Sequence, residues 1–409
     1  MTGPLSHIQV LDLSRVLAGP WASQNLADLG ANVIKIERPI DGDDTRKWGP
    51  PYLKDRDGND TSETAYNMAA NRNKRSATID LSKAEGALLV RKLALKSDIL
   101  IENFRVGGAA KFRLGYDELA AENPGLIYCS ITGFGQNGPY KDRGGYDFII
   151  QAMGGLMSIT GEPGDQGGGP QKVGLAVSDL FTGMYASVAI LAAVTHRERT
   201  GEGQVIEVPM FESLVDYLMI EHLSGASFDP PIGEMGFARL LSSMRKPYET
   251  KDGYLSVLPY TDANWRDLFE LAGREDLQDD PRFVDLSTRM RNSQEIYEIL
   301  ADIVSTRTCA EWQRDLDVAA IPAQIVKGKD DLLNDEQLAA TGFWKFVEHP
   351  TEGGIRMTEP PVRYSKSSSS IRRLQPRLGE HSNDLLAEAG YSDEEIQAFF
   401  ESGVSAQPN

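Results

Sequence analysis

The stretch of sequence that decides the fold runs from residue 7 to residue 37 and reads HIQVLDLSRVLAGPWASQNLADLGANVIKIE. Its two ends, residues 8–13 and 33–37, are short apolar runs containing Val and Ile, and they predict β-strands. Between them, Gly19 and Pro20 open a predicted helix, because proline suits the first helical position, where its missing N–H would be unpaired anyway. Gly30 ends that helix. This order predicts two parallel strands joined by a crossover helix.

The alternation of strands and helices continues beyond this stretch. Ser82 stands three residues before Glu85, the spacing of a capping box, and predicts a helix that reaches residue 95. From Asp179 onward, apolar residues recur at helical period until Gly201, which predicts a long helix with one apolar stripe. The predicted fold class is therefore α/β, with a Rossmann-like, doubly wound large domain. Further strands are predicted at residues 77–81, 98–102, 126–132 and 204–208, and further helices at 146–157 and 211–223.

The second half of the chain changes composition and lacks this alternation. A stretch rich in Gly and Pro around Pro230 and Pro231 predicts a linker, and a smaller α+β domain is expected after it. The predicted division is 1–224 for the first part of the large domain, 225–250 for a linker, 251–325 for the small domain, 326–345 for a second linker and 346–409 for a return to the large domain.

Composition limits the functions that are open to the chain. Its 409 residues carry a net charge of −18, which disfavours a nucleic-acid partner. The two cysteines, Cys129 and Cys309, lie far apart and form no CxxC motif, so neither a disulfide framework nor a metal site is expected. The longest apolar run, residues 185–194, is about half the length of a membrane span. We expect a cytoplasmic protein without a membrane partner.

The common catalytic motifs are missing from the sequence. It contains no GxSxG, no GxxxxGK[ST], no HExxH and no GxGxxG. What stands out is Asp179, which follows the segment GLAVS at 174–178 and precedes the long apolar helix. Ser178 or Asp179 can simply cap that helix. Alternatively, the positive end of the helix dipole keeps the Asp179 carboxylate ionised and available to an acyl donor. Position alone leaves both interpretations open.

Seven segments of the sequence resemble motifs of a known family. The chain resembles the class III CoA-transferases of the CaiB/BaiF type, and the motifs follow in order over nearly its whole length. They are VLDLSRVLAGP at 10–20, LGANVIKIERP at 29–39, NRNKRS at 71–76, ENF at 102–104, SITGF at 130–134, GYD at 145–147 and LGEH at 378–381.

This resemblance implies a nucleophile and a reaction. The residue that matches Asp179 attacks an acyl-CoA thioester in that family, forming an aspartyl anhydride and then an aspartyl-CoA thioester. An aspartate near its reference pKa of about 3.9 is ionised at neutral pH and needs no general base. Coenzyme A or its acyl thioester is then a substrate, and no permanently bound cofactor is expected. The family also implies an interlocked, ring-like homodimer.

The resemblance and the chemistry that it implies together give candidate site residues. The oxyanion donors are expected among the backbone amides near Leu17 to Gly19. Arg15 or Arg46 is expected to pair with the distal carboxylate of a dicarboxylic acid. The remaining substrate residues are Val16, Ala18, Trp48, Tyr146 and Asp147, and the expected CoA contacts are Arg38, Asn71, Arg72, Asn73, Lys74, Arg75, Asn103, Phe104, Arg105, Lys111, Gly144 and Gly145.

Several reactions remain open at this point. The sequence looks most like the succinyl-CoA:dicarboxylate transferases, such as those acting on glutarate. The related α-methylacyl-CoA racemases carry His at the position of Tyr146, and a phenol with a pKa near 10 is a poor base for the α-proton. Formyl-CoA/oxalate enzymes have Gln at the position of Leu17, so that interpretation is weaker. A carnitine-type transferase and an inactive CoA-binding paralogue complete the alternatives.

Overall fold

The computed structural model describes residues 3–55, 57–161, 168–350 and 353–407. The chain divides into two compact units. The large unit comprises residues 1–157, 172–217 and 339–409, and the small unit comprises residues 158–171 and 218–338.

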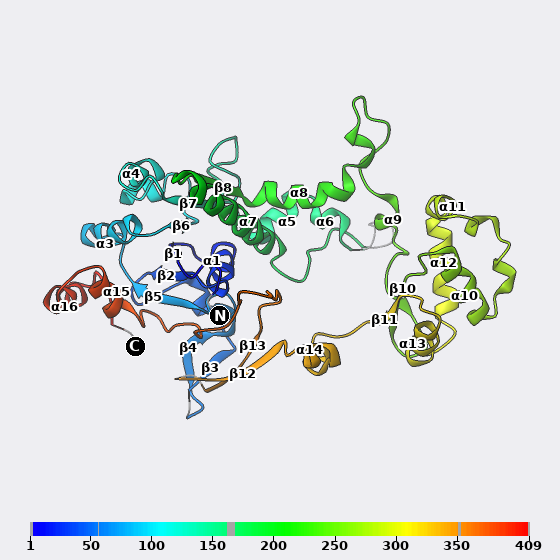
Figure 1. Ribbon diagram of the computed structural model, residues 1–409. Helices are drawn as coiled ribbons and strands as arrows, with labels where there is room; N and C mark the ends of the chain where they lie inside the picture. Colours follow the sequence, from blue (N-terminus) through cyan, green and yellow to red (C-terminus); the bar gives the residue numbers. More distant parts are fainter. Residues whose placement is uncertain (1–2, 56, 162–167, 351–352, 408–409) are drawn as a thin grey trace. The chain divides into compact units, whose positions relative to one another are not determined.

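The large unit is built on six parallel strands in the order β5-β2-β1-β6-β7-β8, all labelled in Figure 1. Val10 of β1 stands opposite Val33 of β2 and Ile99 of β6. This is the strand order of a doubly wound sheet, in which ligands bind at the carboxyl edge where the order reverses. That point lies between β1 and β6. The strands are β1 (Gln9–Asp12), β2 (Asn32–Glu37), β5 (Lys74–Thr78), β6 (Ile99–Glu102), β7 (Ile127–Thr132) and β8 (Val205–Pro209).

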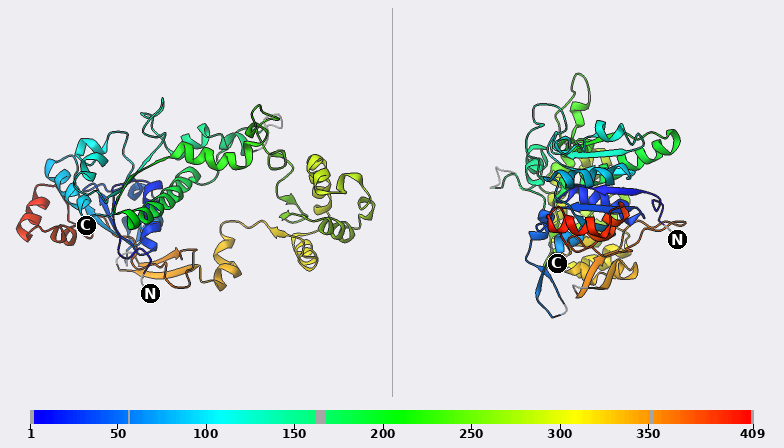
Figure 2. Two further views of the ribbon diagram at one scale, coloured as in Figure 1. Left: turned by 45° about the horizontal axis from the view of Figure 1, so that its top comes forward. Right: turned by 90° about the vertical axis from the view of Figure 1, so that its left-hand side faces the viewer.

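Helices cover both faces of this sheet (Figure 2). Successive side chains of a strand point to opposite faces, so Val10 joins the core beneath one helical layer and Leu11 joins the core beneath the other. The first layer contains α1 (Ala18–Asp28), α5 (Asp147–Met153), α7 (Val177–Thr200) and α8 (Met210–His222). The second contains α3 (Ala84–Leu95), α4 (Tyr116–Ala120), α15 (Ser382–Glu388) and α16 (Asp393–Glu401).

Helix α7 is long and apolar enough to cross a membrane by length and composition alone. Its side chains Ala186, Ile190 and Ala193 are nevertheless buried in the core of the large unit. A helix packed in this way against a sheet has the apolar stripe that a core helix requires. We therefore assign α7 to the core of the large unit.

The last segment of the chain completes the edge of the sheet at β5. The His381 amide donates to the Ser76 carbonyl (2.8 Å), and the Thr78 amide donates to the Ser382 hydroxyl (3.0 Å). A little further on, the Asp80 amide donates to the Val404 carbonyl. The edge strand is thereby covered by chain from the other end of the sequence.

The small unit has a core of its own. Its antiparallel sheet has the order β11-β10-β9, and Trp312, Phe269 and Leu300 are buried beneath the helices beside it. The elements are β9 (Tyr248–Glu249), β10 (Tyr254–Val257), β11 (Ala323–Ile325), α9 (Ala238–Leu241), α10 (Asp262–Ala272), α11 (Leu286–Arg291), α12 (Ser293–Val304) and α13 (Cys309–Val318).

Two short hairpins and three short helices complete the α-helices and β-strands of the described residues, which also contain short 3-10 helices such as Asp44–Lys47 and Ala109–Phe112. The hairpins pair antiparallel strands. These elements are β3 (Tyr52–Lys54), β4 (Asp60–Thr64), β12 (Trp344–His349), β13 (Gly353–Thr358), α2 (Ala65–Ala69), α6 (Leu156–Ile159) and α14 (Glu336–Ala340).

The structure corrects two of the predicted helix starts. The capping box at Ser82 is wrong, because the Ser82 hydroxyl donates to the Asp80 carboxylate (2.6 Å) and no side chain caps α3. The capping interpretation of Ser178 and Asp179 is also wrong, since α7 begins at Val177 and both residues lie inside its first turn. The strand predicted at 77–81 lies instead at Lys74–Thr78, because the chain turns at Asp80.

Candidate active site

Asp179 is the third residue of α7, where the backbone amides of the first turn have no partners within the helix. Asp147, from the first turn of α5, accepts some of the hydrogen bonds that these amides cannot make within the helix. Its carboxylate accepts from the Ser178 amide (2.8 Å), from the Ser178 hydroxyl and from the Gln151 side chain (2.7 Å). The start of α7 is therefore capped by a carboxylate of another helix. Among the described residues no hydrogen bond or ion pair uses the Asp179 carboxylate, which is thus uncommitted.

The environment of Asp179 raises the pKa of its carboxyl group. Burial, followed by the negative charge of Asp147, raises the pKa of Asp179 to about 7. The sequence suggested a pKa near 3.9, because the helix dipole and the reference value both favour the ion. Desolvation outweighs the dipole here. Asp179 is therefore only partly ionised at neutral pH in the free protein.

The packing of α1 against α7 places Asp179 near the start of α1. A side chain on Gly183, one turn after Asp179, would lie 2.8 Å from the Ala18 carbonyl. Two turns after Asp179, Ser187 accepts from the Asn25 side chain (3.3 Å). Asp179 lies one turn before Gly183 on α7, and Ala18 is the first residue of α1. The candidate nucleophile is thus placed near the end of the turn that joins β1 to α1.

That turn is held in an unusual conformation. Val16 has φ +70°, a value that β-branched residues rarely adopt. Among the described residues, no recorded hydrogen bond uses the amides of Leu17, Ala18 or Gly19. They lie at the start of α1, where amide groups point toward an anion. These free donors fit the oxyanion site expected at residues 17–19.

Two aromatic side chains stand near the carboxylates. Trp48 packs edge-on against Tyr66, with 5.0 Å between ring centroids. Burial raises the pKa of Tyr66, and the charges of Asp179 and Asp147 raise it further, so the phenol lies within electrostatic reach of both. Sequence reasoning proposed Trp48 and missed Tyr66. No local signal marks Tyr66, which reaches this place only because β3, β4 and α2 fold beside the sheet.

Tyr146 and the glycines before it border the same region. Tyr146 precedes α5 and is 68% exposed, so its phenol is available to a substrate. Gly145 is required by packing, because a Cβ at this position would lie 2.2 Å from the Cα of Gly133. Gly144 is exposed, with no such contact at its backbone.

A cavity of about 260 Å³ opens at the carboxyl edge of β1 and β2. The cations Arg15 and Arg38 line it beside the apolar side chain of Phe104, and both arginines also pair with the exposed Asp44 (3.0 and 2.8 Å). Cations and an aromatic ring at this edge suit a nucleotide-bearing ligand. Two other expected CoA contacts, Arg105 and Lys111, are exposed on the segment after β6.

The expected phosphate contacts at 71–75 lie elsewhere. Arg72 and Asn73 are buried and bind Asp28 (2.7 Å each), and Lys74 is fully buried against Asp12 (3.1 Å). Asn71 accepts from Lys74, and Arg75 pairs with Glu388. Asn71, Arg72, Asn73 and Lys74 would have to give up buried partners to reach a phosphate, and Arg75 would have to leave the exposed Glu388, so the geometry argues against the expectation.

Two further expectations change in the same way. Arg46 is buried between Glu37 (2.7 Å) and Glu63, which argues against its use as a clamp for an acid and leaves Arg15 for that role. Asn103 uses both ends of its amide on the Arg15 backbone, accepting from the Arg15 amide (3.0 Å) and donating to the Arg15 carbonyl (2.8 Å). Its side chain is thus engaged by the turn rather than by the cavity.

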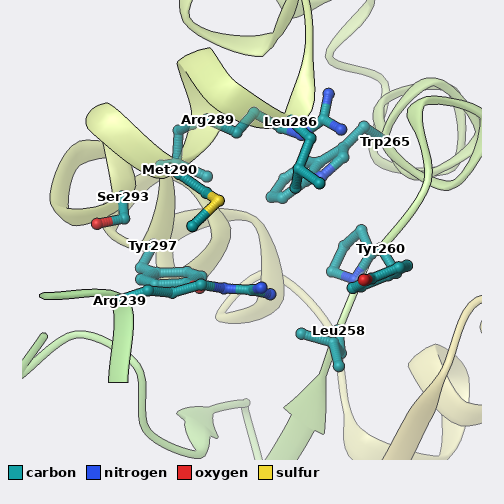
Figure 3. A pocket seen from close by; sticks show the side chains of 11 residues that line it. Arg239, Leu258, Tyr260, Trp265, Leu286, Arg289, Met290, Ser293 and Tyr297 are labelled. Atoms are coloured by element: carbon teal, nitrogen blue, oxygen red, sulfur yellow. The ribbon is translucent and has the colours of Figure 1, made fainter. Parts of the chain in front are cut away.

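A smaller hollow lies within the small unit (Figure 3). Its volume is about 30 Å³, and the side chain of Arg239 extends past the Tyr297 ring into it. Arg289, buried at the rim, pairs with Asp262 (2.6 Å). A space of this size holds little more than a carboxylate group or a water. Among the described residues, no cluster of three His, Cys, Asp or Glu side chains is placed to hold a metal ion.

Comparison with known proteins gives a consistent result. Residues 5–382 match the model of CoA-transferase family III. The chain is 43% identical to succinate–glutarate CoA-transferase of Agrobacterium fabrum, with 94% of this chain and 95% of that protein covered. It is 36% identical to succinyl-CoA:glutarate CoA-transferase of Mus musculus, with 99% and 91% covered.

A solved structure agrees with the fold. The chain matches the crystal structure of a CAIB/BAIF family protein from Brucella suis with a TM-score of 0.81 and 38% identity, covering 95% of this chain and all of that one. The family model, the relatives and the structure point the same way. The chain belongs to CoA-transferase family III.

Proposed function

We propose that this enzyme moves CoA from succinyl-CoA to a free dicarboxylic acid of the glutarate type. Relatives named as succinate–glutarate and succinyl-CoA:glutarate CoA-transferases support this choice of substrates. The observation that carries the mechanism is the uncommitted Asp179 carboxylate, one turn from the close contact between Gly183 and Ala18. CoA enters as a substrate, and the proposal includes no resident cofactor.

The first half-reaction begins with the Asp179 carboxylate. One oxygen attacks the thioester carbon of succinyl-CoA, the C–S bond breaks, and CoA leaves as the thiolate. The thiolate then attacks the aspartyl carbon of the resulting anhydride and releases succinate. Each tetrahedral intermediate carries an oxyanion, which the amides of Leu17, Ala18 and Gly19 stabilise. Asp179 is left as the CoA thioester.

The second half-reaction reverses these steps with the new acid. The acceptor carboxylate attacks the aspartyl thioester carbon, and CoA leaves again as the thiolate. The thiolate attacks the acceptor's acyl carbon, forming the new thioester and restoring the Asp179 carboxylate. Water has to be kept away from the anhydride, and the aromatic pair Trp48 and Tyr66 provides one wall for that purpose.

Arg15 is proposed as the partner of the acceptor's distal carboxylate. Its side chain is about half exposed and lines the cavity, and its present partner Asp44 is itself exposed, so a substrate can displace that ion pair at small cost. Arg15→Gln should reduce kcat/KM for glutarate about tenfold or more, with a smaller effect on butyrate. The exposed Arg266→Gln is the control and should leave kcat/KM for both acids unchanged. An equal loss of kcat/KM for glutarate and butyrate in Arg15→Gln would contradict the clamp.

The active protein is proposed to be a homodimer of interlocked rings in the cytoplasm. Helices α5 and α7 leave a group of apolar side chains exposed, and surfaces of this kind mark protein contacts. They are Phe148, Ile149, Met184 and Val188. Sedimentation equilibrium should give twice the 45.0 kDa of one chain, and a single-chain mass under assay conditions would refute the dimer.

The decisive experiment replaces the nucleophile. Asp179→Asn should lower exchange between succinyl-CoA and glutarate by a factor on the order of 10³ or more, while the exposed Asp267→Asn should leave it unchanged. Hydroxylamine added during turnover should mark Asp179 as a hydroxamate in peptide mass spectra. Parental activity in Asp179→Asn, or a missing mark in the active parent, would overturn the mechanism.

A racemase is the second candidate, since it would also bind acyl-CoA at this edge. The exposed Tyr146 stands where those enzymes use His, and this disfavours proton removal at the α-carbon. Incubation of a 2-methylacyl-CoA in deuterium oxide without an acid acceptor separates the two reactions. Deuterium at the α-carbon would support the racemase.

A further inference from the structure

The backbone of Val16 is strained, and contacts from neighbouring segments hold it in the strained conformation. Its φ of +70° lies in the left-handed region, where a β-branched side chain crowds its own backbone. Such a conformation persists only where the surroundings determine it. The groups that hold the turn from Ser14 to Val16 are therefore worth identifying.

Three side chains from three different strands or loops hold this turn. Asn103, after β6, binds both the amide and the carbonyl of Arg15 (3.0 and 2.8 Å). The Asp43 carboxylate accepts from the Val16 amide (3.2 Å to each oxygen). Lys35, on β2, donates both to the Ser14 carbonyl (2.9 Å) and to Asp43 (3.0 Å). Four backbone groups in succession are thus fixed from outside the turn.

We propose that Asn103 and Asp43 are positioning residues that force Val16 into the left-handed conformation and thereby preset the amides of Leu17, Ala18 and Gly19 toward Asp179. The inference rests on the proposed function, in which these amides stabilise the oxyanions. Relaxation of Val16 to negative φ would rotate the peptide that follows it and turn the donors away. Asn103, assigned to diphosphate binding from the sequence, acts here through the backbone of the catalytic turn.

A double-mutant cycle tests this role. Asn103→Ala should lower kcat about tenfold or more with little change in KM for succinyl-CoA, because the donors act on the transition state rather than on substrate binding. Val16→Gly makes the left-handed conformation acceptable without a clamp. The loss caused by Asn103→Ala should therefore be at least about fivefold smaller in the Val16→Gly background than in the parent.

Other outcomes overturn the proposal. An increase in KM for succinyl-CoA at constant kcat would make Asn103 a CoA ligand, and equal losses in both backgrounds would show that Val16 is not what Asn103 holds. If Asn103→Ala does not fold, Asn103→Asp serves, since it keeps the acceptor for the Arg15 amide and loses the donor to the Arg15 carbonyl. Its loss should likewise shrink in the Val16→Gly background, and an equal loss in both would overturn the proposal.

A structural readout separates this inference from the function. The amides of Arg15 and Val16 donate to Asn103 and Asp43, and their hydrogen exchange, followed by mass spectrometry, should accelerate in Asn103→Ala whether or not the protein is a transferase. Unchanged exchange there would refute the clamp, whereas parental activity in Asp179→Asn would refute the proposed function and leave the clamp intact.

The hollow of the small unit carries a second inference on independent grounds. The Arg239 Nε donates to the hydroxyl of the buried Tyr297 (3.0 Å), which fixes the guanidinium in place. Among the described residues, no recorded contact uses its two terminal nitrogens. Arg289 beside it is already paired with Asp262, and none of the described residues that line the hollow is acidic. Arg239 is thus a cation without an acidic partner in a hollow that Tyr260, Trp265 and Tyr297 also line.

We infer that this hollow binds the carboxylate of a small aliphatic acid. The two free nitrogens of Arg239 match the two oxygens of a carboxylate, and Tyr260 and Trp265 provide apolar walls for the attached carbon chain (Figure 3). The volume of about 30 Å³ admits the carboxylate group, with the rest of the acid extending outward.

Calorimetric titration with glutarate, without any CoA compound, tests the site. Arg239→Gln should weaken binding about tenfold or more, whereas the exposed Arg266→Gln on α10 should bind as the parent does. Binding that survives in Arg239→Gln and vanishes in Arg15→Gln would assign glutarate to the large unit alone and refute the hollow. Absence of binding in the parent would refute it as well.

Discussion

At the scale of single residues, Asp179 is subject to opposed influences. The first turn of α7 favours the ion, whereas burial and the neighbouring Asp147 favour the acid and raise the pKa of Asp179 to about 7. A carboxylate that is costly to ionise binds its proton more tightly and attacks more readily once that proton is lost. In the proposed mechanism, burial rather than a basic partner increases the nucleophilic strength of Asp179.

This shift predicts a pH dependence of activity. The value of kcat/KM for succinyl-CoA should rise with pH through a midpoint near 7 and then level off, because only the carboxylate attacks. Asp147→Asn removes a negative charge and should move the midpoint to lower pH. Initial rates from pH 5 to 9 measure both. A flat profile in the parent would contradict the raised pKa.

The same shift predicts a pH dependence of stability. The folded protein binds the Asp179 proton more tightly than the unfolded chain, so this residue lowers the free energy of unfolding as pH rises from about 4 to about 7. Asp179→Asn should therefore stabilise the fold at pH 8 by roughly 1–4 kcal/mol and have little effect near pH 4. Chemical denaturation of both proteins at these two pH values provides the measurement.

At the scale of elements, the contact between α1 and α7 brings the proposed nucleophile near the proposed oxyanion donors. Gly183 allows the two helices to approach, since a Cβ there would lie 2.8 Å from both the Ala18 carbonyl and the Trp21 ring. Nothing in the sequence distinguishes Gly183 from the other small residues of this apolar helix. Close packing of two helices is a property of the pair, and neither sequence segment contains it alone.

Gly183→Val tests the importance of this contact. The added side chain should push the helices apart, lower the free energy of unfolding by about 1–3 kcal/mol and lower kcat more than it raises KM. Thermal unfolding and steady-state kinetics measure the two effects. Ala189→Val, a similar addition at a partly exposed position of the same helix, is the control and should leave both quantities near those of the parent.

The sequence predicted the elements better than it predicted their side-chain partners. Apolar runs and helix-end residues placed β1, α1, β2 and α7 within a few residues, and the family resemblance assigned Arg72 and Lys74 to phosphate. In the structure, Asp28 and Asp12 neutralise them inside the large unit. A basic run has the same composition whether its partners are internal or external, and only the fold decides between them.

At the scale of the whole molecule, buried ion pairs link the βα turns of the sheet. Lys35 pairs with Asp43, and Arg46 pairs with Glu37 and Glu63. Burial raises the pKa of Asp43, but the Lys35 charge and hydrogen bonds from Lys35 and Thr45 together outweigh burial and lower that pKa to about 2. A lowered pKa in the folded state adds stability above about pH 4 that is lost as the pH falls toward 2.

Part of the loss of folding free energy at acid pH is therefore expected to come from protonation of Asp43. Asp43 should contribute about 2 kcal/mol at pH 7, lost between about pH 4 and pH 2. Asp43→Asn should lower stability at pH 7 and flatten the acid limb, as measured by urea denaturation between pH 2.5 and 7. An equally steep limb in that variant would assign the acid sensitivity to other groups.

The covering of β5 by the end of the chain has a consequence for synthesis. The backbone at Ser76, Thr78 and Asp80 finds its partners at His381, Ser382 and Val404, more than 300 positions later. A ribosome that has made the first 200 residues has therefore produced a sheet with one open border, able to pair with another nascent strand. We expect a chaperone to shield this edge until translation ends, because the last segment to be synthesised covers the edge of the first domain.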